Sequence, residues 1–227
     1  MRKVKLIQQK FDEIWNSLEP KPHQRTYDFK WVIDEVEKIK PKIIVEMGTA
    51  TGGSLKYWEQ ILLDCKENGN NFGDCLLISL ENNPGCFPTW DWKNSKVDIH
   101  IVYGSSNDLN IVKKVKVILK NRKIDFLFID GAHRYSIPEG DFNNYSQFVR
   151  EAGIVCIADL GEPCPAHLFL QLPEPREVDP TIGMGIWRKQ KQPEDIKVKL
   201  CSNKGESTGE AYTEILNIFR FRVPNPP

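Results

Sequence analysis

Acidic residues follow four separate apolar runs of this sequence, and acids in such positions can bind cations or orient ligand hydroxyls. Glu46, Glu81, Asp130 and Asp159 each stand at or beside the end of a short run rich in Val, Ile, Leu or Phe. If the runs are parallel strands, their carboxyl ends share one edge of the sheet, where open α/β sheets bind ligands. We therefore expect four carboxylates along one rim of a binding site.

A glycine-containing segment, EMGTATGGS (46–54), joins the first acid to a predicted helix. Glycines permit a sharp turn and close approach of a ligand, and helix N-terminal amides favour a carboxylate or phosphate. One interpretation is a dinucleotide fingerprint with Glu81 on the ribose, but Glu81 lies 28 residues after Gly53 where about 20 is usual. The other is a ligand with an ammonium and a sulfonium, which Glu46 would attract while it would repel a pyrophosphate.

These motifs, with the acid after the second strand and IDGAHRY (129–135) after the fourth, carry a family resemblance. The chain resembles class I S-adenosylmethionine-dependent methyltransferases over about residues 42–159. It is most similar to the branch of cephalosporin-hydroxylase-like and macrocin-type O-methyltransferases. It departs from the pattern at Ala50, at Ala132 and at Leu160, where relatives often have a glycine, an acid and a second metal ligand respectively.

The resemblance implies S-adenosyl-L-methionine as the cofactor. Glu81 would accept both ribose hydroxyls, and Ser105 and Ser106 would lie by the adenine. Ser106 or Asn107 could also be the N-cap of the helix that follows, a role compatible with cofactor binding. The full set of expected cofactor-binding residues is Glu46, Gly48, Thr49, Gly52, Ser54, Glu81, Ser105, Ser106 and Asp130.

The resemblance also implies catalytic roles for His133 and Asp130. His133 would be the general base that takes a proton from a substrate hydroxyl, although a loop histidine can simply bond local backbone. Asp130 and Asp159 should end adjacent strands about 4.8 Å apart, where two carboxylates repel unless a proton or cation intervenes. Relatives place a Mg²⁺-type ion there, and Leu160 leaves such a site one ligand short.

Alternation of strand-like and helix-like segments predicts the elements that position these residues. We expect an α/β fold, a doubly wound Rossmann-like and mostly parallel sheet with helices on both faces. An N-terminal helical extension would occupy residues 1–40, with helices near 6–18 and 28–39, and the methyltransferase domain 41–227. Residues 162–180 contain five prolines and predict a long loop, with one helical turn near 167–172. Late strands are expected at 182–188 and 215–221.

Composition excludes several classes of function. The 227 residues include 31 Lys and Arg against 31 Asp and Glu, which gives no footprint for nucleic acid or anionic lipid. Apolar runs are too short for a membrane span, and the six scattered cysteines suggest no disulfide framework.

We therefore expect a cytoplasmic enzyme that O-methylates a small hydroxylated molecule, with oligomeric state, a homo-oligomer included, left open. The alternatives are a nicotinamide-dependent oxidoreductase and a non-catalytic cofactor-binding module.

Overall fold

A seven-stranded sheet forms the centre of the molecule in the computed structural model, with strand order β3-β2-β1-β4-β5-β7-β6. The structure describes residues 11–13, 15–16, 21–67, 75–191, 196–200 and 208–219. The first five strands run parallel, while β7 is antiparallel to both β5 and β6. The strands are β1 (Ile43–Met47), β2 (Leu76–Glu81), β3 (Asp98–Tyr103), β4 (Ile124–Ile129), β5 (Val149–Ile157), β6 (Arg176–Val178) and β7 (Gly185–Arg188).

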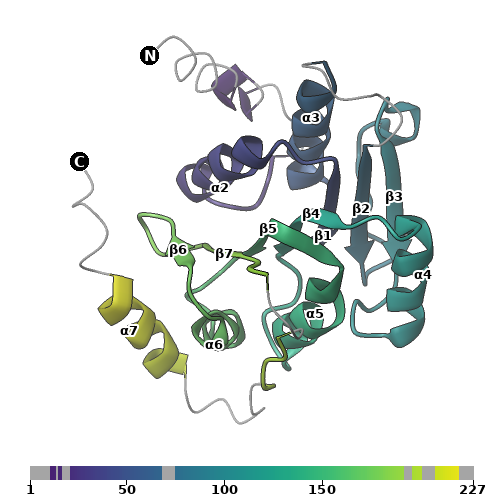
Figure 1. Cartoon of the computed structure of the whole chain (residues 1–227). Helices are drawn as coiled ribbons and strands as arrows, with labels where there is room; N and C mark the ends of the chain where they lie inside the picture. The colour runs from purple at the N-terminus through teal and green to yellow at the C-terminus, as the bar shows by residue number, and fades with distance from the viewer. Residues whose placement is uncertain are drawn as a thin grey trace.

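Helices cover both faces of this sheet (Figure 1). On one face lie α2 (Thr26–Ile39) and α3 (Gly53–Glu67), whose apolar residues pack on Ile44, Phe126 and Phe128 of the sheet. The opposite face carries α4 (Leu109–Leu119), α5 (Ile137–Tyr145), α6 (Pro163–Gln171) and α7 (Thr208–Phe219). The doubly wound, mostly parallel α/β fold predicted from the sequence is confirmed.

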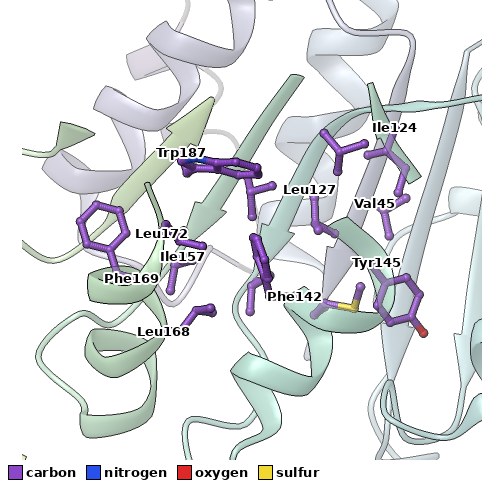
Figure 2. Close-up of a cluster of buried hydrophobic side chains, with 14 of the residues drawn as sticks. Val45, Ile124, Leu127, Phe142, Tyr145, Ile157, Leu168, Phe169, Leu172 and Trp187 are labelled. Atoms are coloured by element: carbon purple, nitrogen blue, oxygen red, sulfur yellow. The ribbon is translucent and has the colours of Figure 1, made fainter. Parts of the chain in front are cut away.

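Buried strands explain why the parallel part of the sheet reads as continuous apolar runs. Every residue of β1 and of β2 is buried. Figure 2 shows the core on the second face, where Trp187 of β7 and Phe142 of α5 meet edge to face with ring centroids 5.6 Å apart. Side chains from distant parts of the chain thus lock β7 and α5 against the central strands.

The proline-rich segment 162–180 is more regular than expected. It contains α6 and β6. The helix tolerates Pro163 and Pro165 because they fall in its first turn, where a missing N–H costs nothing. The strand expected at 215–221 is wrong over its described part, residues 215–219, which belongs to α7. Ile215 and Phe219 lie four residues apart and are both buried, which is helical spacing.

The N-terminal region is only partly described. Most of the helix expected at 6–18 lies outside the described residues, whereas α2 matches the second helix and packs directly on the sheet. The domain boundary near residue 40 stays a prediction. Within the described part of the chain, no helix combines the length and apolar character needed to cross a membrane.

Candidate active site

A cavity of about 890 Å³ opens at the carboxyl ends of the parallel strands. This is the edge at which the sequence placed the four acids, and three of them, Glu81, Asp130 and Asp159, lie on its wall. Seven segments or pairs supply most of that wall: 21–25, 47–51, 53–54, 80–83, 104–106, 130–133 and 181–184. The cavity therefore brings together the glycine turn and the Asp130 loop, as predicted.

The glycine turn between β1 and α3 needs glycine for steric reasons. Gly48 has φ +96°, and a Cβ there would lie 2.3 Å from the carbonyl oxygen of Asp130. A Cβ on Gly53 would lie 2.5 Å from the backbone of Lys21 and Pro22. The glycine turn thus packs against the backbone of Asp130 on one side and against the backbone of Lys21 and Pro22, before α2, on the other.

Glu81, at the end of β2, points into the cavity with its carboxylate held by two backbone amides. Ala50 N–H donates to Oε2 and Asn83 N–H donates to Oε1, each at 2.8 Å. A carboxylate can accept about four hydrogen bonds, so lone pairs remain for a ligand. Glu81 therefore offers an oriented pair of acceptors next to the glycine turn.

Glu46 lies behind the turn, and it is absent from the cavity wall where the sequence analysis placed it. Its buried carboxylate accepts hydrogen bonds from Ser54 Oγ at 2.5 Å, Ser79 Oγ at 2.8 Å and Trp58 Nε1 at 2.9 Å. Burial raises its pKa to about 7, although these hydrogen bonds favour the charged form. Strand pairing explains the arrangement, because Glu46 is opposite Ser79 in the β1–β2 register.

Glu46 is still connected to the cavity wall through its hydrogen-bond partners Ser54 and Ser79. Ser79 Oγ lies 2.6 Å from Thr49 Oγ1, and both Thr49 and Ser54 are on the wall. Sequence reasoning missed Ser79 and Trp58, because each is an ordinary core position in its own element. Gly52, which was also expected to bind the cofactor, does not line the cavity. Pro88 packs against it, and a Cβ on Gly52 would lie 2.8 Å from the Cβ of Pro88.

The turn after β3 closes the cavity beyond Glu81. Gly104, Ser105 and Ser106 line it, and α4 is capped by Asp108, whose side chain accepts from Asn110 N–H at 2.8 Å. Capping is thus not the role of the two serines. The hydroxyl of Tyr145 donates to the Ser106 carbonyl at 3.0 Å, so α5 holds the turn in place.

Asp130, His133 and Asp159 converge at the other end of the cavity. Asp130 follows β4 and Asp159 follows the neighbouring β5, as predicted. His133 Nε2 lies 3.0 Å from Asp159 Oδ2 and 3.9 Å from Asp130 Oδ1. One potential ligand atom from each residue lies within 4.8 Å of the others, a spacing that suits a metal ion.

Mutual charge shifts the proton affinities in this cluster. Burial and the charge of Asp159 raise the pKa of the Asp130 carboxyl to about 6, although contacts with His133 and Gln24 favour its charged form. Asp130 and Asp159 in turn raise the pKa of His133, outweighing its partial burial. The imidazole is thus placed to hold a proton between two acids.

Residues that sequence reasoning missed complete this end of the cavity. The Gln24 amide Nε2 donates to Asp130 Oδ2, and Arg25 Nη2 donates to Thr181 Oγ1 at 2.8 Å. The Thr181 hydroxyl also donates to the buried carboxylate of Asp28. These residues come from opposite ends of the described chain, and no local motif marks them. Leu160 is fully buried in the core, so the position cannot ligate a metal.

The chain is similar to known proteins in both sequence and fold. The family model described as Rhamnosyl O-methyltransferase/CmcI matches residues 21–161, more than half of the chain. No curated protein matches the chain. The chain spans 38% of the length of a MycE methyltransferase structure solved with Mg, SAH and mycinamycin VI, at a TM-score of 0.45 and 14% identity over 68% of this chain.

Three solved structures are similar over most of their length. CalS11, a TDP-rhamnose 3'-O-methyltransferase of calicheamicin biosynthesis, has a TM-score of 0.57 at 12% identity, covering 83% of this chain and 95% of that one. Cofactor-bound Rv0187 from MTB gives 0.53 at 12%, covering 82% and 88%. The Bacillus cereus O-methyltransferase with SAH gives 0.51 at 14%, covering 83% and 91%. These likenesses establish the fold, and the matching family model establishes that the chain belongs to the Rhamnosyl O-methyltransferase/CmcI family.

Proposed function

We propose that this protein is an S-adenosyl-L-methionine-dependent O-methyltransferase that methylates a hydroxyl of a small molecule. The observation that carries the proposal is a single cavity with Glu81 and the glycine turn at one end and Asp130, His133 and Asp159 at the other. A methyl donor and an acceptor must meet in line, and this cavity offers one end to each. Family membership favours this activity over a nicotinamide-dependent reaction.

The cofactor end supplies the groups that a nucleoside with an amino-acid tail requires. Glu81 would accept the two ribose hydroxyls, and Ser105 and Ser106 would lie along the base. The wall at Gly48, Thr49 and Ser54 would hold the methionine part. Glu46 supports this wall from behind through Ser54 and Ser79, so we assign it a positioning role.

His133 is the proposed general base. It lines the cavity, is partly accessible, and its buried Nε2 lies 3.0 Å from Asp159 Oδ2 without the alignment of a hydrogen bond in the described structure. Asp159 and Asp130 flank this nitrogen and would stabilise the imidazolium that forms when a substrate hydroxyl loses its proton. Asp130 would therefore stabilise the protonated base, and it is also part of the cavity wall.

The same acids fit a divalent cation. Two carboxylates close together, beside buried nitrogen and oxygen atoms that lack hydrogen-bond partners among the described residues, form a hard donor set. Asp130 and Asp159 would hold a Mg²⁺-type ion, and such an ion lowers the pKa of a hydroxyl bound to it. His133 Nε2 cannot bind a cation and accept a proton together, and we assign it the proton.

Calorimetric titration with S-adenosylhomocysteine and, separately, with NAD tests the proposal. We expect one S-adenosylhomocysteine per chain and no heat from NAD. The reverse result would contradict it. A labelled-methyl assay over hydroxylated metabolites then identifies the acceptor, and binding without transfer to any of them would favour a non-catalytic module. The cytoplasmic location and the oligomeric state remain predictions.

A further inference from the structure

The segment 21–25, just before α2, forms a wall over the reactive end of the cavity. It contacts three separate parts of the fold. The backbone of Lys21 and Pro22 packs against Gly53 of the glycine turn, Gln24 reaches Asp130 after β4, and Arg25 reaches Thr181 between β6 and β7. Gln24 is therefore fixed by its neighbours on both sides and faces the acidic cluster.

The two polar atoms of the Gln24 amide have different surroundings. Nε2 donates to Asp130 Oδ2, whereas Oε1 is buried and has no hydrogen-bond partner in the described structure. Both atoms are bonded to the same carbon, so Oε1 lies beside the same carboxylate. A buried amide oxygen without a partner carries a desolvation penalty, and a water molecule or a bound cation would relieve it.

Leu160, the residue after Asp159, supplies no oxygen ligand to the acidic cluster. That side chain is fully buried in the core and has no oxygen. Hard divalent cations prefer six or more oxygen ligands, and glutamine carbonyl oxygens are among those that proteins use. Asp130 and Asp159 supply carboxylates, and Gln24 Oε1 is the neighbouring buried oxygen that is left without a partner in the described residues.

We propose that Gln24, through Oε1, is a protein ligand of the divalent cation held by Asp130 and Asp159, in place of the ligand that Leu160 cannot provide. The inference rests on the cation of the proposed function and names a further residue of that site. Cation binding would also hold the segment before α2, which forms a wall of the reactive end, against the ends of β4 and β5.

The first test is Mn²⁺ affinity, measured on the apo protein by electron paramagnetic resonance of the free ion. Gln24→Ala should weaken Mn²⁺ binding at least about tenfold, in the range seen when metal-site groups are removed. Gln24→Glu keeps an oxygen there and should bind Mn²⁺ at least as tightly as the wild type. The matched control is Gln60→Ala on α3, which removes another glutamine that donates to an aspartate, Asp64, at 2.9 Å and away from the cavity. It should leave Mn²⁺ affinity unchanged.

The second test separates a ligand from a residue that only orients Asp130. Water-proton relaxation of bound Mn²⁺ counts coordinated waters, and the count should rise by one in Gln24→Ala because water replaces the amide oxygen. An unchanged water count would overturn the proposal, as would unchanged affinity or a wild type that binds no Mn²⁺.

Titration with S-adenosylhomocysteine reports separately on the proposed function and on folding. All four proteins should bind it. Failure of the wild type to bind would contradict the proposed function, whereas the Mn²⁺ results alone decide the role of Gln24. If Gln24→Ala lost both ligands, Gln24→Glu would decide, and weakened Mn²⁺ binding in a Gln24→Glu variant that still binds S-adenosylhomocysteine would overturn the proposal.

Discussion

The two ends of the cavity are assembled in different ways. The cofactor end comes from the turns after β1, β2 and β3, which follow one another in the chain and lie side by side in the sheet. The reactive end collects segments from distant parts of the chain: 21–25, 130–133, 159, 161–162 and 181–184. The first depends on local turn chemistry, while the second depends on tertiary packing that no single segment encodes.

This difference suggests that the ends can be damaged separately. Substitutions at the reactive end should lower the rate and spare cofactor binding, and those at the cofactor end should do the reverse. Gly48 and Gly53 are exceptions, because both belong to the glycine turn but lie against the reactive end, Gly48 at the backbone of Asp130 and Gly53 at the backbone of Lys21 and Pro22.

His133→Ala should cause the largest loss. Removal of a general base lowers kcat by about 10²–10⁴-fold, or about 3–5 kcal/mol in the barrier. The dissociation constants of S-adenosylhomocysteine and Mn²⁺ should stay near those of the wild type, measured by calorimetry and paramagnetic resonance. His100→Ala is the control, because His100 also lies 3.0 Å from an aspartate, Asp98, but outside the cavity. A lost Mn²⁺ site in His133→Ala would make the histidine a ligand instead of the base.

Gly48→Ala should damage both ends together. The new Cβ would meet the Asp130 carbonyl oxygen at 2.3 Å in a backbone with φ +96°, so we expect about 2–4 kcal/mol lower unfolding free energy. Gly161→Ala is the matched control on the same wall, because a Cβ there meets nothing within 4 Å among the described residues. Urea denaturation and calorimetry measure the two effects. A Gly48→Ala protein as stable and as active as Gly161→Ala would refute the contact between the ends.

Glu81→Gln should weaken the cofactor end alone. Replacing a charged acceptor by an amide weakens the hydrogen bonds to a ribose, and we expect about a tenfold to hundredfold rise in the dissociation constant of S-adenosylhomocysteine. Mn²⁺ affinity should not change. The control, Glu177→Gln on β6, removes a half-exposed carboxylate outside the cavity. Equal S-adenosylhomocysteine affinities for Glu81→Gln and the wild type would remove the ribose assignment.

Asp141→Asn should change the pH dependence of stability. Burial and the charge of Glu139 raise the pKa of Asp141 to about 7, while contacts with Ser106 and Asn107 oppose the rise. Because the ordinary pKa is 3.8, the folded state retains a proton that the unfolded state loses between about pH 4 and 7. The contribution of Asp141 to the free energy of unfolding is therefore favourable at low pH and is lost as the pH rises through 7.

The asparagine variant should lack that slope and gain about 2–3 kcal/mol relative to the wild type between pH 5 and pH 8. Urea denaturation at the two pH values measures it, with exposed Asp91→Asn as the control. Identical slopes in wild type and Asp141→Asn would show that another group carries the pH dependence.

The sequence predicted the fold and the cofactor end better than the reactive end. Buried parallel strands and the glycine turn leave strong local patterns, so the sheet and the placement of Glu81 followed from them. Glu46 was expected on the wall, but strand pairing turns it toward Ser79 and Trp58. Alternation along β1 puts Glu46 on the same face as Ile44, and the sequence alone does not show that α3 covers this face with Trp58.

At the reactive end, Asp130, His133 and Asp159 were found because each belongs to a motif or ends a strand. Gln24 and Thr181 were missed because each stands in a short connection without periodicity, and only the fold brings them to the site. Only the end of α6 was expected, near 167–172, and its first turn was missed because prolines usually interrupt helices, although in a first turn they do not.

A crystal structure of the protein with S-adenosylhomocysteine tests the central claim most directly. We expect the ribose hydroxyls on the Glu81 carboxylate, the homocysteine part along Gly48 and Ser54, and the sulfur facing the end that holds Asp130 and His133. A ligand bound with its ribose away from Glu81, or with its sulfur directed away from His133, would contradict the account.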